Sequence, residues 1–526
     1  MASTVTKRTK ILLLLGIIGT VFLILGCVSL IVFDDIIHSQ VSKQIPLNKK
    51  GKTYQEWKSP KVPIYFQVWA FDIVNHLEIL DGQKPAVLQR GPYTYREKRT
   101  KHGVKFFENG TVFYKERRSF VFDRSLSVGP ENDTVTSVNL AMAAVMTVLR
   151  YEPSLLKTLV DGAFKFWGET LFVKMSVHDL LWGREDNILK AVTDLAKSYN
   201  VTLPINDTVG LLMGQNNSNT GDFIIHSGQR GLTDFASIVS WNGERELSVW
   251  TSDYANSING SLGVFFPPFV RKDRNQDIFS TDLTRSLSLT FQKEVELHGI
   301  PLYKFYAPPI TFANVSINPL NAGFCTPPGH CLPSGLLNMT NVYYGVPLVL
   351  SNPNFLFCDP DIVESVRGLR PDREAYENHL NIEPFTGITM DGAKRMQINL
   401  HLQRIDDFPE TYKLRPVFMP ILWLNESARI PKDQADDFKH QVLNMVFALT
   451  IVKYCLIGLG AFLLLIAASF PLVHRIVRNR SSDGDNGNIQ RSRQSRGLNR
   501  TNRNNNSDDD PILDHTSGSD NGQDIY

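Results

Sequence analysis

Two cysteines, Cys325 and Cys331, stand six residues apart in the segment NAGFCTPPGHCLPSG, and His330 lies between them. Such a group could hold a metal ion, form a redox pair or form a structural disulfide. The spacing does not decide among these, because a thiolate persists in a reducing compartment and a disulfide in an oxidising one. A zinc site needs about four ligands, and only His330 and the distant Cys358 are on offer. The choice therefore depends on which side of a membrane the segment occupies.

No other pattern in the sequence is typical of catalysis. The chain has no Gly-x-Ser-x-Gly elbow, no His-Glu-x-x-His motif and no Gly-x-x-x-x-Gly-Lys loop. Histidines such as His178 and His226 have no partners at catalytic or metal-binding spacing, so we expect structural or surface roles for them. The sequence gives no reason to expect an enzyme, a cofactor or a metal site.

Two long apolar runs are predicted to be transmembrane helices. Residues 11–33 and 454–473 carry no charged side chain, and an α-helix needs about 20 apolar residues to cross a bilayer. A cleaved signal peptide is the alternative for the first run, but its apolar part is normally about 7 to 15 residues long. We therefore expect the chain to cross the membrane twice.

Charged residues beside the two spans predict the orientation of the chain. Basic residues precede the first span and follow the second, namely Lys7, Arg8, Lys10, Arg475, Arg478 and Arg480. By the positive-inside rule both termini are cytosolic. The predicted organisation is a cytosolic segment 1–10, a span 11–33, a lumenal or extracellular ectodomain 34–453, a span 454–473 and a cytosolic tail 474–526.

The ectodomain carries sequence signals of the secretory pathway. Nine Asn-x-Ser/Thr sequons predict N-glycosylation, at Asn109, Asn132, Asn200, Asn206, Asn216, Asn259, Asn314, Asn338 and Asn425. In this oxidising compartment, Cys325 and Cys331 are expected to form a disulfide that closes a tight loop, worth on the order of 2 to 3 kcal/mol. Cys27 and Cys455 fall in the spans. Cys358 is left as a buried free thiol or, alternatively, an intermolecular link.

The ectodomain is predicted to be rich in β-structure. Asn109-Gly110 lies between aromatic and β-branched runs in residues 105–115, which is a strong hairpin signal. Apolar and polar residues alternate over residues 396–402, as in a half-buried strand. Residues 416–424, 286–297 and 302–306 are also expected to be strands. The net charge of +2 and an apolar content of 42% suit a large globular core and give no sign of nucleic-acid binding.

Helix signals gather in residues 138–199. Apolar residues from Leu155 to Trp167 recur at helical spacing after Glu152-Pro153-Ser154. Another amphipathic segment is expected to run from Val177 to Ala196. Helices inserted into a β framework predict the α+β class.

The tail, residues 474–526, is polar and is expected to be disordered. Its eight arginines lie between Arg475 and Arg503, and six aspartates follow between Asp508 and Asp524. The basic half could lie against an anionic inner leaflet or could simply be the charged flank of the span.

Several segments of the chain resemble the class B scavenger receptor family, which includes the fatty-acid translocase, the high-density-lipoprotein receptor and the type 2 lysosomal integral membrane protein. The matching segments run through nearly the whole ectodomain: GPYTY at 91–95, LLWG at 180–183, WNG at 241–243, NAGFC at 321–325, EPFTG at 383–387, AKRMQ at 393–397 and LWLNE at 422–426. Each is weak alone, and their order and spacing together carry the resemblance.

The resemblance implies a fold and a set of partners. The fold would be a large antiparallel β-barrel-like ectodomain with a helical bundle at its apex, residues 138–199, and an apolar tunnel toward the bilayer. Ligands would be lipids (fatty acids, sterols, phospholipids), lipoproteins or a lysosomal hydrolase, and a homo-oligomer is left open. The candidate ligand-binding residues at the apex are Lys157, Phe164, Lys165 and Trp167, although solvated helix faces explain the two lysines as well.

The chain also departs from the lysosomal branch of that family. That branch resembles this chain but has cysteines near the positions of Ala255, Thr284 and Val342, and the last two would be bridged there. A histidine that makes hydrolase binding sensitive to acid falls near Ser154. Because serine does not titrate near pH 6, delivery of a hydrolase under pH control is less expected than lipid handling.

A short segment of the tail resembles a sorting signal. In DDDPIL, Asp508 stands four residues before Ile512 and Leu513, as in acidic dileucine motifs that clathrin adaptors bind as extended peptides. The motif predicts a lysosomal or endosomal membrane location, with the plasma membrane as a further site. The expected function is a two-span receptor that passes lipid through its ectodomain, and the alternative is a trafficking receptor for a soluble hydrolase.

Overall fold

A computed structural model describes residues 2–187, 189–191, 194, 208–343 and 346–494 of the chain. It divides into two compact units. One comprises Met1–Phe33 with Ala448–Tyr526, and the other, which we call the ectodomain, comprises Asp34–Phe447. Helices and an antiparallel sheet both contribute, which confirms the predicted α+β class.

The first unit contains the apolar parts of two long helices, α1 (Ala2–Gln44) and α12 (Asn444–Gln494). Stretches long and apolar enough to cross a membrane lie within Lys10–Gln44 and Lys432–Ser469. Helix α12 continues through residues 474–494, so the prediction of disorder is wrong for this part of the tail. Residues 495–526 lie outside the described residues.

Close backbone approach joins α1 to α12 in this unit. A Cβ atom added at Gly460 would lie 2.6 Å from the backbone nitrogen of Leu23 and 2.9 Å from the carbonyl oxygen of Gly19. Small residues allow such packing between spanning helices, where apolar burial drives little association. A Cβ added at Gly458 would meet no atom within 4 Å.

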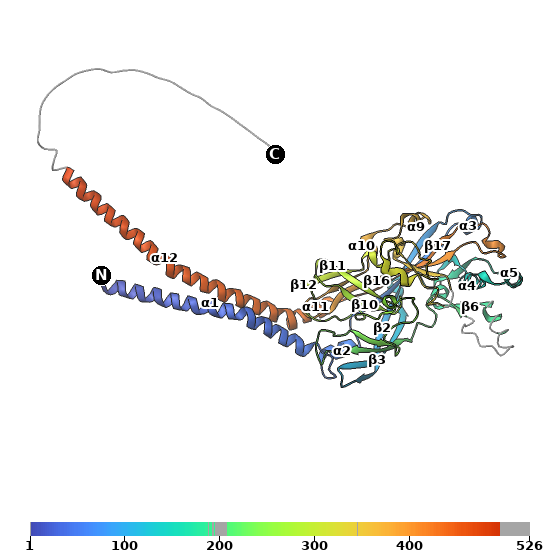
Figure 1. Cartoon of the computed structure of the whole chain (residues 1–526), viewed down its shortest axis with the longest axis horizontal. Coiled ribbons are helices and arrows are strands. Elements are labelled where there is room, and N and C mark those ends of the chain that lie inside the picture. The colour runs from blue at the N-terminus through green and yellow to red at the C-terminus, as the bar shows by residue number, and fades with distance from the viewer. Residues whose placement is uncertain (1, 188, 192–193, 195–207, 344–345, 495–526) are drawn as a thin grey trace, which may run out of the picture. The chain divides into compact units, whose positions relative to one another are not determined.

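Thirteen strands of the described residues form the main sheet of the ectodomain (Figure 1). The path runs β10-β11-β12-β15-β16-β17-β1-β2-β3-β8-β9, and β14 joins β13 to β16. The strands are β1 (Ile64–Ile73), β2 (Val87–Phe106), β3 (Thr111–Phe122), β8 (Ser218–His226), β9 (Ile238–Trp241), β10 (Gln276–Ser280), β11 (Arg285–Leu297), β12 (Ile300–Tyr306), β13 (Leu336–Asn338), β14 (Leu348–Ser351), β15 (His379–Ile382), β16 (Thr389–Leu402) and β17 (Val417–Arg429).

A connecting segment bridges the two ends of this sheet. Ser261 pairs with Ile278 of β10, and the carbonyl of Gly260 accepts a hydrogen bond from the backbone of Ile238 in β9 at 2.8 Å. Phe265 forms a further bridge to Ile388. The sheet is thereby nearly closed, as a barrel-like ectodomain requires.

Local sequence signals explain several strands. Strands β2 and β3 form the predicted hairpin, with Gly110 at a φ of +82° in its turn. Strand β16 is confirmed over residues 396–402, but the prediction that only one face is buried is wrong. Gln397 and Asn399 are buried as well, because Gln397 accepts from the backbone of Asn354 and Asn399 donates to Val349.

The helix-rich region lies at one end of the ectodomain, opposite α2 (Lys52–Lys58) and α11 (Lys432–Phe438) (Figure 1). It comprises α4 (Leu140–Val148), α5 (Ser154–Trp167), α6 (Val177–Trp182) and the pairs β4 (Thr134–Val138)–β5 (Phe172–Ser176) and β6 (Arg184–Glu185)–β7 (Thr208–Val209). Shorter helices elsewhere are α3 (His76–Leu80), α8 (Asp253–Asn256), α9 (Pro360–Glu364) and α10 (Arg373–Tyr376).

Helix α5 is confirmed: it begins at Ser154, in the Glu152-Pro153-Ser154 segment where the sequence predicted its start. The prediction of one helix from Val177 to Ala196 is wrong, because α6 ends at Trp182. Gly183 has a φ of +100°, a backbone conformation that favours glycine and breaks a helix. Residues 187, 189–191 and 194 are helical again.

We predict that cysteines placed at Gly16 and Ala467 will crosslink α1 to α12. A Cβ at Gly16 would lie 3.7 Å from the Cβ of Ala467, within the ~3.5 to 4.5 Å range of disulfides. The measurement oxidises the double variant in a background with Cys27→Ala and Cys455→Ala, cleaves the ectodomain with a protease and asks whether the two halves stay joined. Adding Gly460→Leu should abolish the crosslink, whereas Gly458→Leu should leave it. Equal crosslinking in both would contradict the packing.

Candidate functional site

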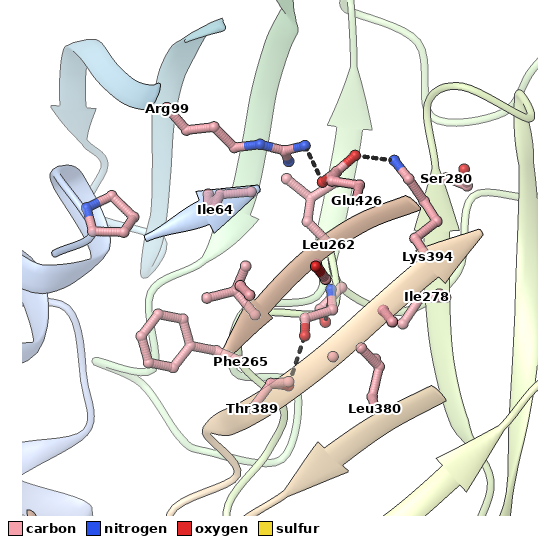
Figure 2. A pocket seen from close by; sticks show the side chains of 18 of the residues that line it. Ile64, Arg99, Leu262, Phe265, Ile278, Ser280, Leu380, Thr389, Lys394 and Glu426 are labelled. Carbon is pink, nitrogen blue, oxygen red and sulfur yellow. Dashed lines mark hydrogen bonds and ion pairs between the residues drawn. The ribbon is translucent and has the colours of Figure 1, made fainter. Parts of the chain in front are cut away.

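The sheet of the ectodomain encloses a chamber of about 480 Å³ (Figure 2). Its walls are mainly apolar because strands and connecting segments turn aliphatic and aromatic side chains inward. The apolar lining includes Trp57, Ile64, Phe223, Leu262, Phe265, Ile278, Leu289, Leu380, Met390 and Phe438. A volume of this size is within the ~300 to 1,000 Å³ typical of sites for small organic ligands.

One end of the chamber is formed by segments next to the two spans in sequence. Trp57 of α2 and Phe438 of α11 both line it. The two segments also touch each other, since Lys52 donates a hydrogen bond to Gln441 at 2.7 Å. The chamber therefore reaches the end of the ectodomain where the chain continues into α1 and α12.

One wall of the chamber carries eight charged side chains, which we call the ionic cluster. Its members are Glu97, Arg99, Lys101, Glu116, Arg118, Asp282, Lys394 and Glu426. Four are cationic and four are anionic. All but Glu97 line the chamber directly.

Ion pairs join the members of the ionic cluster into one network. Arg118 contacts Glu97 at 2.8 Å, Asp282 at 3.2 Å and Glu426 at 3.1 Å. Arg99 contacts Glu97 at 2.7 Å and also pairs with Glu426. Lys394 contacts Glu426 at 2.6 Å and pairs with Asp282, and Lys101 contacts Glu116 at 2.9 Å. Figure 2 shows Glu426 between Arg99 and Lys394.

The period of the β-strand brings these charges together. Glu97, Arg99 and Lys101 alternate along β2, so they point to one face. The register pairs Lys101 with Glu116 and Lys394 with Glu426. The alternating charges were visible in the sequence, but charged residues at every second position also describe a solvent-facing strand, so the sequence analysis missed the cluster.

Burial and charge act in opposite directions on these carboxylates. Burial alone would raise the pKa of Glu426, but Arg99, Lys394 and Arg118 together lower it to about 2. The pKa of Asp282 is also lowered, because Lys394 and Arg118 outweigh the effect of burial. For Glu97 burial prevails and raises the pKa, and its Oε2 atom has no hydrogen-bond partner in the described structure.

A second cavity of about 40 Å³ lies on the other side of part of the ionic cluster. Its lining includes Phe66, Leu212, Tyr343 and Ile398. Four members of the cluster line both cavities: Arg118, Asp282, Lys394 and Glu426. Leu350 and Met396 also line both, so charged and apolar side chains together lie at the boundary of the two cavities.

The four candidate ligand-binding residues of α5 lie in different environments. Lys157 is buried and forms an ion pair with Asp407 at 2.9 Å, and Phe164 is buried against Phe408. Lys165 is exposed and contacts Asp161 at 2.6 Å, and Trp167 is partly exposed. The geometry gives Lys157 and Phe164 packing roles and leaves Lys165 and Trp167 able to reach a ligand. Sequence alone did not reveal Asp407, which is 250 residues from Lys157.

Large apolar side chains cover the outer face of α5 and the turn before it. Tyr151 is 90% exposed, Phe166 84%, Leu155 74% and Leu159 63%. Soluble surfaces rarely gather this many large apolar groups unless they contact a partner or a lipid.

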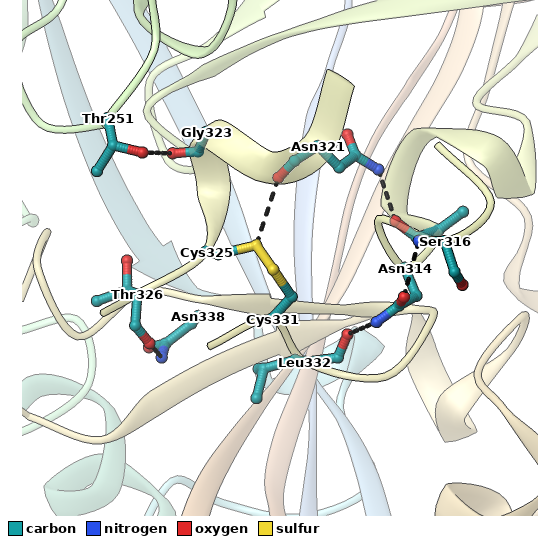
Figure 3. Close-up of a disulfide and its surroundings, with 11 residues drawn as sticks. Thr251, Asn314, Ser316, Asn321, Gly323, Cys325, Thr326, Cys331, Leu332 and Asn338 are labelled. Atoms are coloured by element: carbon teal, nitrogen blue, oxygen red, sulfur yellow. Dashed lines mark hydrogen bonds between the residues drawn. A yellow bond between two sulfur atoms is a disulfide. The ribbon is translucent and has the colours of Figure 1, made fainter. Parts of the chain in front are cut away.

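The cysteine segment forms a disulfide between Cys325 and Cys331 (Figure 3). Cys358 is free, and burial raises the pKa of its thiol. At two positions where the resemblance placed a bridge, Thr284 accepts a hydrogen bond from Trp250 at 2.6 Å and Val342 packs against the main core.

The predicted modification sites fall in several environments. Asn109, Asn132, Asn216 and Asn259 are exposed. The side-chain amides of Asn314, Asn338 and Asn425 are half-buried and donate hydrogen bonds within the protein. Asn200, Asn206 and the sorting motif Asp508, Ile512 and Leu513 lie outside the described residues. Glycosylation and sorting therefore stay predictions.

Sequence comparison with known proteins identifies the family. Residues 17–470 match the CD36 family. The chain belongs to the CD36 family. It is 35% identical over 433 residues to lysosome membrane protein 2 of Mus musculus, covering 82% of this chain and 88% of the relative. It is 34% identical over 462 residues to scavenger receptor class B member 1 of Rattus norvegicus, covering 88% and 89%.

Family membership agrees with the two apolar helices at the ends of the chain. Lysosome membrane protein 2 of Homo sapiens is also similar, with 35% identity over 435 residues. This CD36-family chain is accordingly a membrane protein with two candidate spans and one disulfide in the described residues. The predicted resemblance to class B scavenger receptors is confirmed.

We predict that Glu426→Gln will destabilise the protein by about 3 kcal/mol, because it leaves the buried Arg118 and the partly buried Arg99 and Lys394 with one carboxylate fewer. The folded pKa of Glu426 lies below its unfolded value of about 4.3. Its contribution to the free energy of unfolding is therefore fully present above about pH 4.3 and is lost as pH falls through about 2. The loss of stability in the variant should accordingly be the same at pH 7 and at pH 5. Urea denaturation of the full-length protein in detergent measures it.

The matched control is Asp273→Asn, which removes an exposed carboxylate that also pairs with an arginine, Arg271. Exposed pairs contribute little, so this variant should unfold like the unmodified protein. Equal losses in the two variants would contradict a special role for burial.

Proposed function

We propose that this CD36-family protein is a two-span lipid receptor that captures lipid or lipoprotein beside α5 and passes lipid through its ectodomain to the membrane. The observation that carries the proposal is the apolar chamber of about 480 Å³. It reaches the end of the ectodomain that continues into the two spans, through Trp57 and Phe438.

The chamber offers an energetic advantage to a lipid in transit. A hydrocarbon chain that crosses water exposes each CH₂ at a cost of about 0.8 kcal/mol. Walls of aliphatic and aromatic side chains remove most of that penalty along their length. Fatty acids, sterols and single phospholipid chains are the ligands that such a lining accepts.

The ionic cluster would control passage between the two cavities. A chain moving from the smaller cavity to the chamber would pass the residues that line both, which are Leu350 and Met396 together with the ion-paired Arg118, Asp282, Lys394 and Glu426. Separating these ion pairs leaves buried charges without partners, which is costly. A polar lipid headgroup would supply replacement partners, so amphiphiles should pass more readily than pure hydrocarbons.

Capture is assigned to the exposed apolar face of α5 and the preceding turn. Tyr151, Leu155, Leu159 and Phe166 can insert into the surface of a lipoprotein particle, and Lys165 can meet an anionic group beside them. The same face could hold a soluble hydrolase, which is the alternative function. Ser154, near the position of the acid-sensing histidine in the lysosomal branch, does not favour that alternative.

We predict that filling the chamber will block lipid transfer without preventing capture. Ala393→Phe places a phenyl group from β16 into the chamber, so transfer of a fluorescent fatty acid from lipoprotein to vesicles that contain the full-length protein should fall at least about fivefold. Val121→Phe, at an exposed position of β3, serves as the size-matched control and should transfer lipid normally.

The capture face has its own variant in the same assay. Leu155→Asp with Leu159→Asp should reduce lipoprotein binding, whereas Ala393→Phe should leave binding intact. Full transfer by a well-folded Ala393→Phe protein would refute the chamber as the lipid route. Retained capture of a soluble hydrolase together with absent lipid transfer would favour the alternative.

The location we propose is the lysosomal and endosomal membrane, with passage through the plasma membrane. Support comes from the acidic dileucine motif in the tail and from the relatives named lysosome membrane protein 2. Clathrin adaptors are the partners that such a motif binds.

We predict that Ile512→Ala with Leu513→Ala will move the protein from lysosomes to the cell surface, because the two aliphatic side chains would no longer fill adaptor pockets. Surface biotinylation and lysosomal colocalisation in cells measure the shift, which should be several-fold. Ile489→Ala with Leu498→Ala changes two other aliphatic residues of the tail and should have no effect. Unchanged lysosomal location of the motif variant would remove the motif from the proposal.

A further inference from the structure

Arg285, the first residue of β11, is a buried cation outside the lipid route. It is only 3% exposed. Its guanidinium lies 3.7 Å from the ring centre of Phe324 and 5.0 Å from that of Phe312. The aromatic faces offset part of the cost of burying the charge, but they carry no negative charge of their own.

The polar contacts of Arg285 leave its charge without a counterion. Its Nη2 atom donates to the carbonyl of Thr311 at 3.1 Å and to the side-chain oxygen of Asn321 at 3.4 Å. Both acceptors are neutral. No carboxylate of the described residues forms an ion pair with Arg285, and its Nε atom has no hydrogen-bond partner there. Burial accordingly lowers the pKa of Arg285 to about 10.

The ionic cluster shows what this chain does with other buried arginines. Arg118 is similarly buried and contacts three carboxylates. Burying a guanidinium without such partners costs several kcal/mol. Arg285 therefore differs from Arg118 because no carboxylate of the described residues lies beside it to offset the cost of burying its charge.

A small cavity lies beside Arg285. Its volume is about 30 Å³, and its lining includes Arg285, Phe324, Asn321 and the two cysteines of the disulfide. The exposed His330 also lines it. Figure 3 shows the disulfide next to Asn321 and Asn314. Arg285 and the disulfide loop therefore line the same cavity.

We propose that Arg285 and this cavity form a binding site for a small monovalent inorganic anion of the size of chloride. The site supplies a buried positive charge without a counterion among the described residues, and Nε adds an N–H group without a partner. An anion in the cavity would neutralise the charge. Water would satisfy only the hydrogen bond.

The size and lining of the cavity select among anions. A space of about 30 Å³ takes one or two particles as large as water, which excludes the tail of a lipid and disfavours sulfate or phosphate. The side-chain amides of Asn314, Asn321 and Asn338 each donate a hydrogen bond to a backbone carbonyl. Arg285 supplies the one permanent positive charge among the residues that line the cavity, which suits a monovalent ion.

The test measures the midpoint temperature of thermal unfolding for the full-length protein in detergent. It compares sodium chloride with sodium gluconate at equal ionic strength. An anion that binds only the folded state stabilises it by mass action. The midpoint should rise by about 1 to 3 °C with chloride, saturating at millimolar concentration, and bromide should replace chloride. Absence of any difference between chloride and gluconate would overturn the proposal.

Two variants locate the effect. Arg285→Met should lose the dependence on halide, and Arg271→Met, which removes an exposed arginine, should keep it. If Arg285→Met fails to fold, the unmodified protein still decides the matter. Crystals of the full-length protein grown in bromide should show an anomalous peak within hydrogen-bond distance of Arg285 Nε, and a halide-dependent protein with no peak there would also overturn the assignment.

Discussion

Buried charge constrains how the strands of the ectodomain pair. The ionic cluster draws on β2, β3, β16, β17 and the turn that carries Asp282. Because side chains alternate between the two faces of a strand, a slip of one residue between β2 and β3 would turn Arg118 away from Glu97. Removing one partner from a buried ion pair is strongly destabilising. The cluster therefore selects one register, and the register sets the shape of the chamber behind it.

The chamber and the ionic cluster together create an interior with two kinds of wall. Side chains such as Phe265 and Leu380 form an apolar surface, while Arg99, Lys394 and Glu426 present matched charges along one wall. A molecule with one apolar and one polar part fits both walls. On the outside, the exposed rings of Tyr151 and Phe166 provide an apolar surface at the helix-rich end. The chamber lining and the outer face of α5 thus both offer an apolar surface, which is the kind of surface that the proposed lipid ligand would contact.

Local patterns in the sequence predicted much of the fold, and distant contacts explain what it could not predict. The turn at Asn109-Gly110 and the helical spacing from Leu155 to Trp167 depend on neighbours within a few residues. The ion pair between Lys157 and Asp407, the clustering of Glu97 with Glu426 and the burial of both faces of β16 depend on residues far apart along the chain. The idea of a lipid passage came from resemblance to a family, and no periodicity could have supplied it.

Strands β1 and β17 are neighbours in the sheet although about 340 residues separate them. A ribosome that adds about 5 to 20 residues each second needs roughly 20 to 70 seconds to make that stretch. Throughout this time one edge of β1 has no partner, and unpaired strand edges invite aggregation. The β1–β17 pairing therefore forms only after nearly the whole ectodomain has been translated, and the exposed edge of β1 is an aggregation hazard until then.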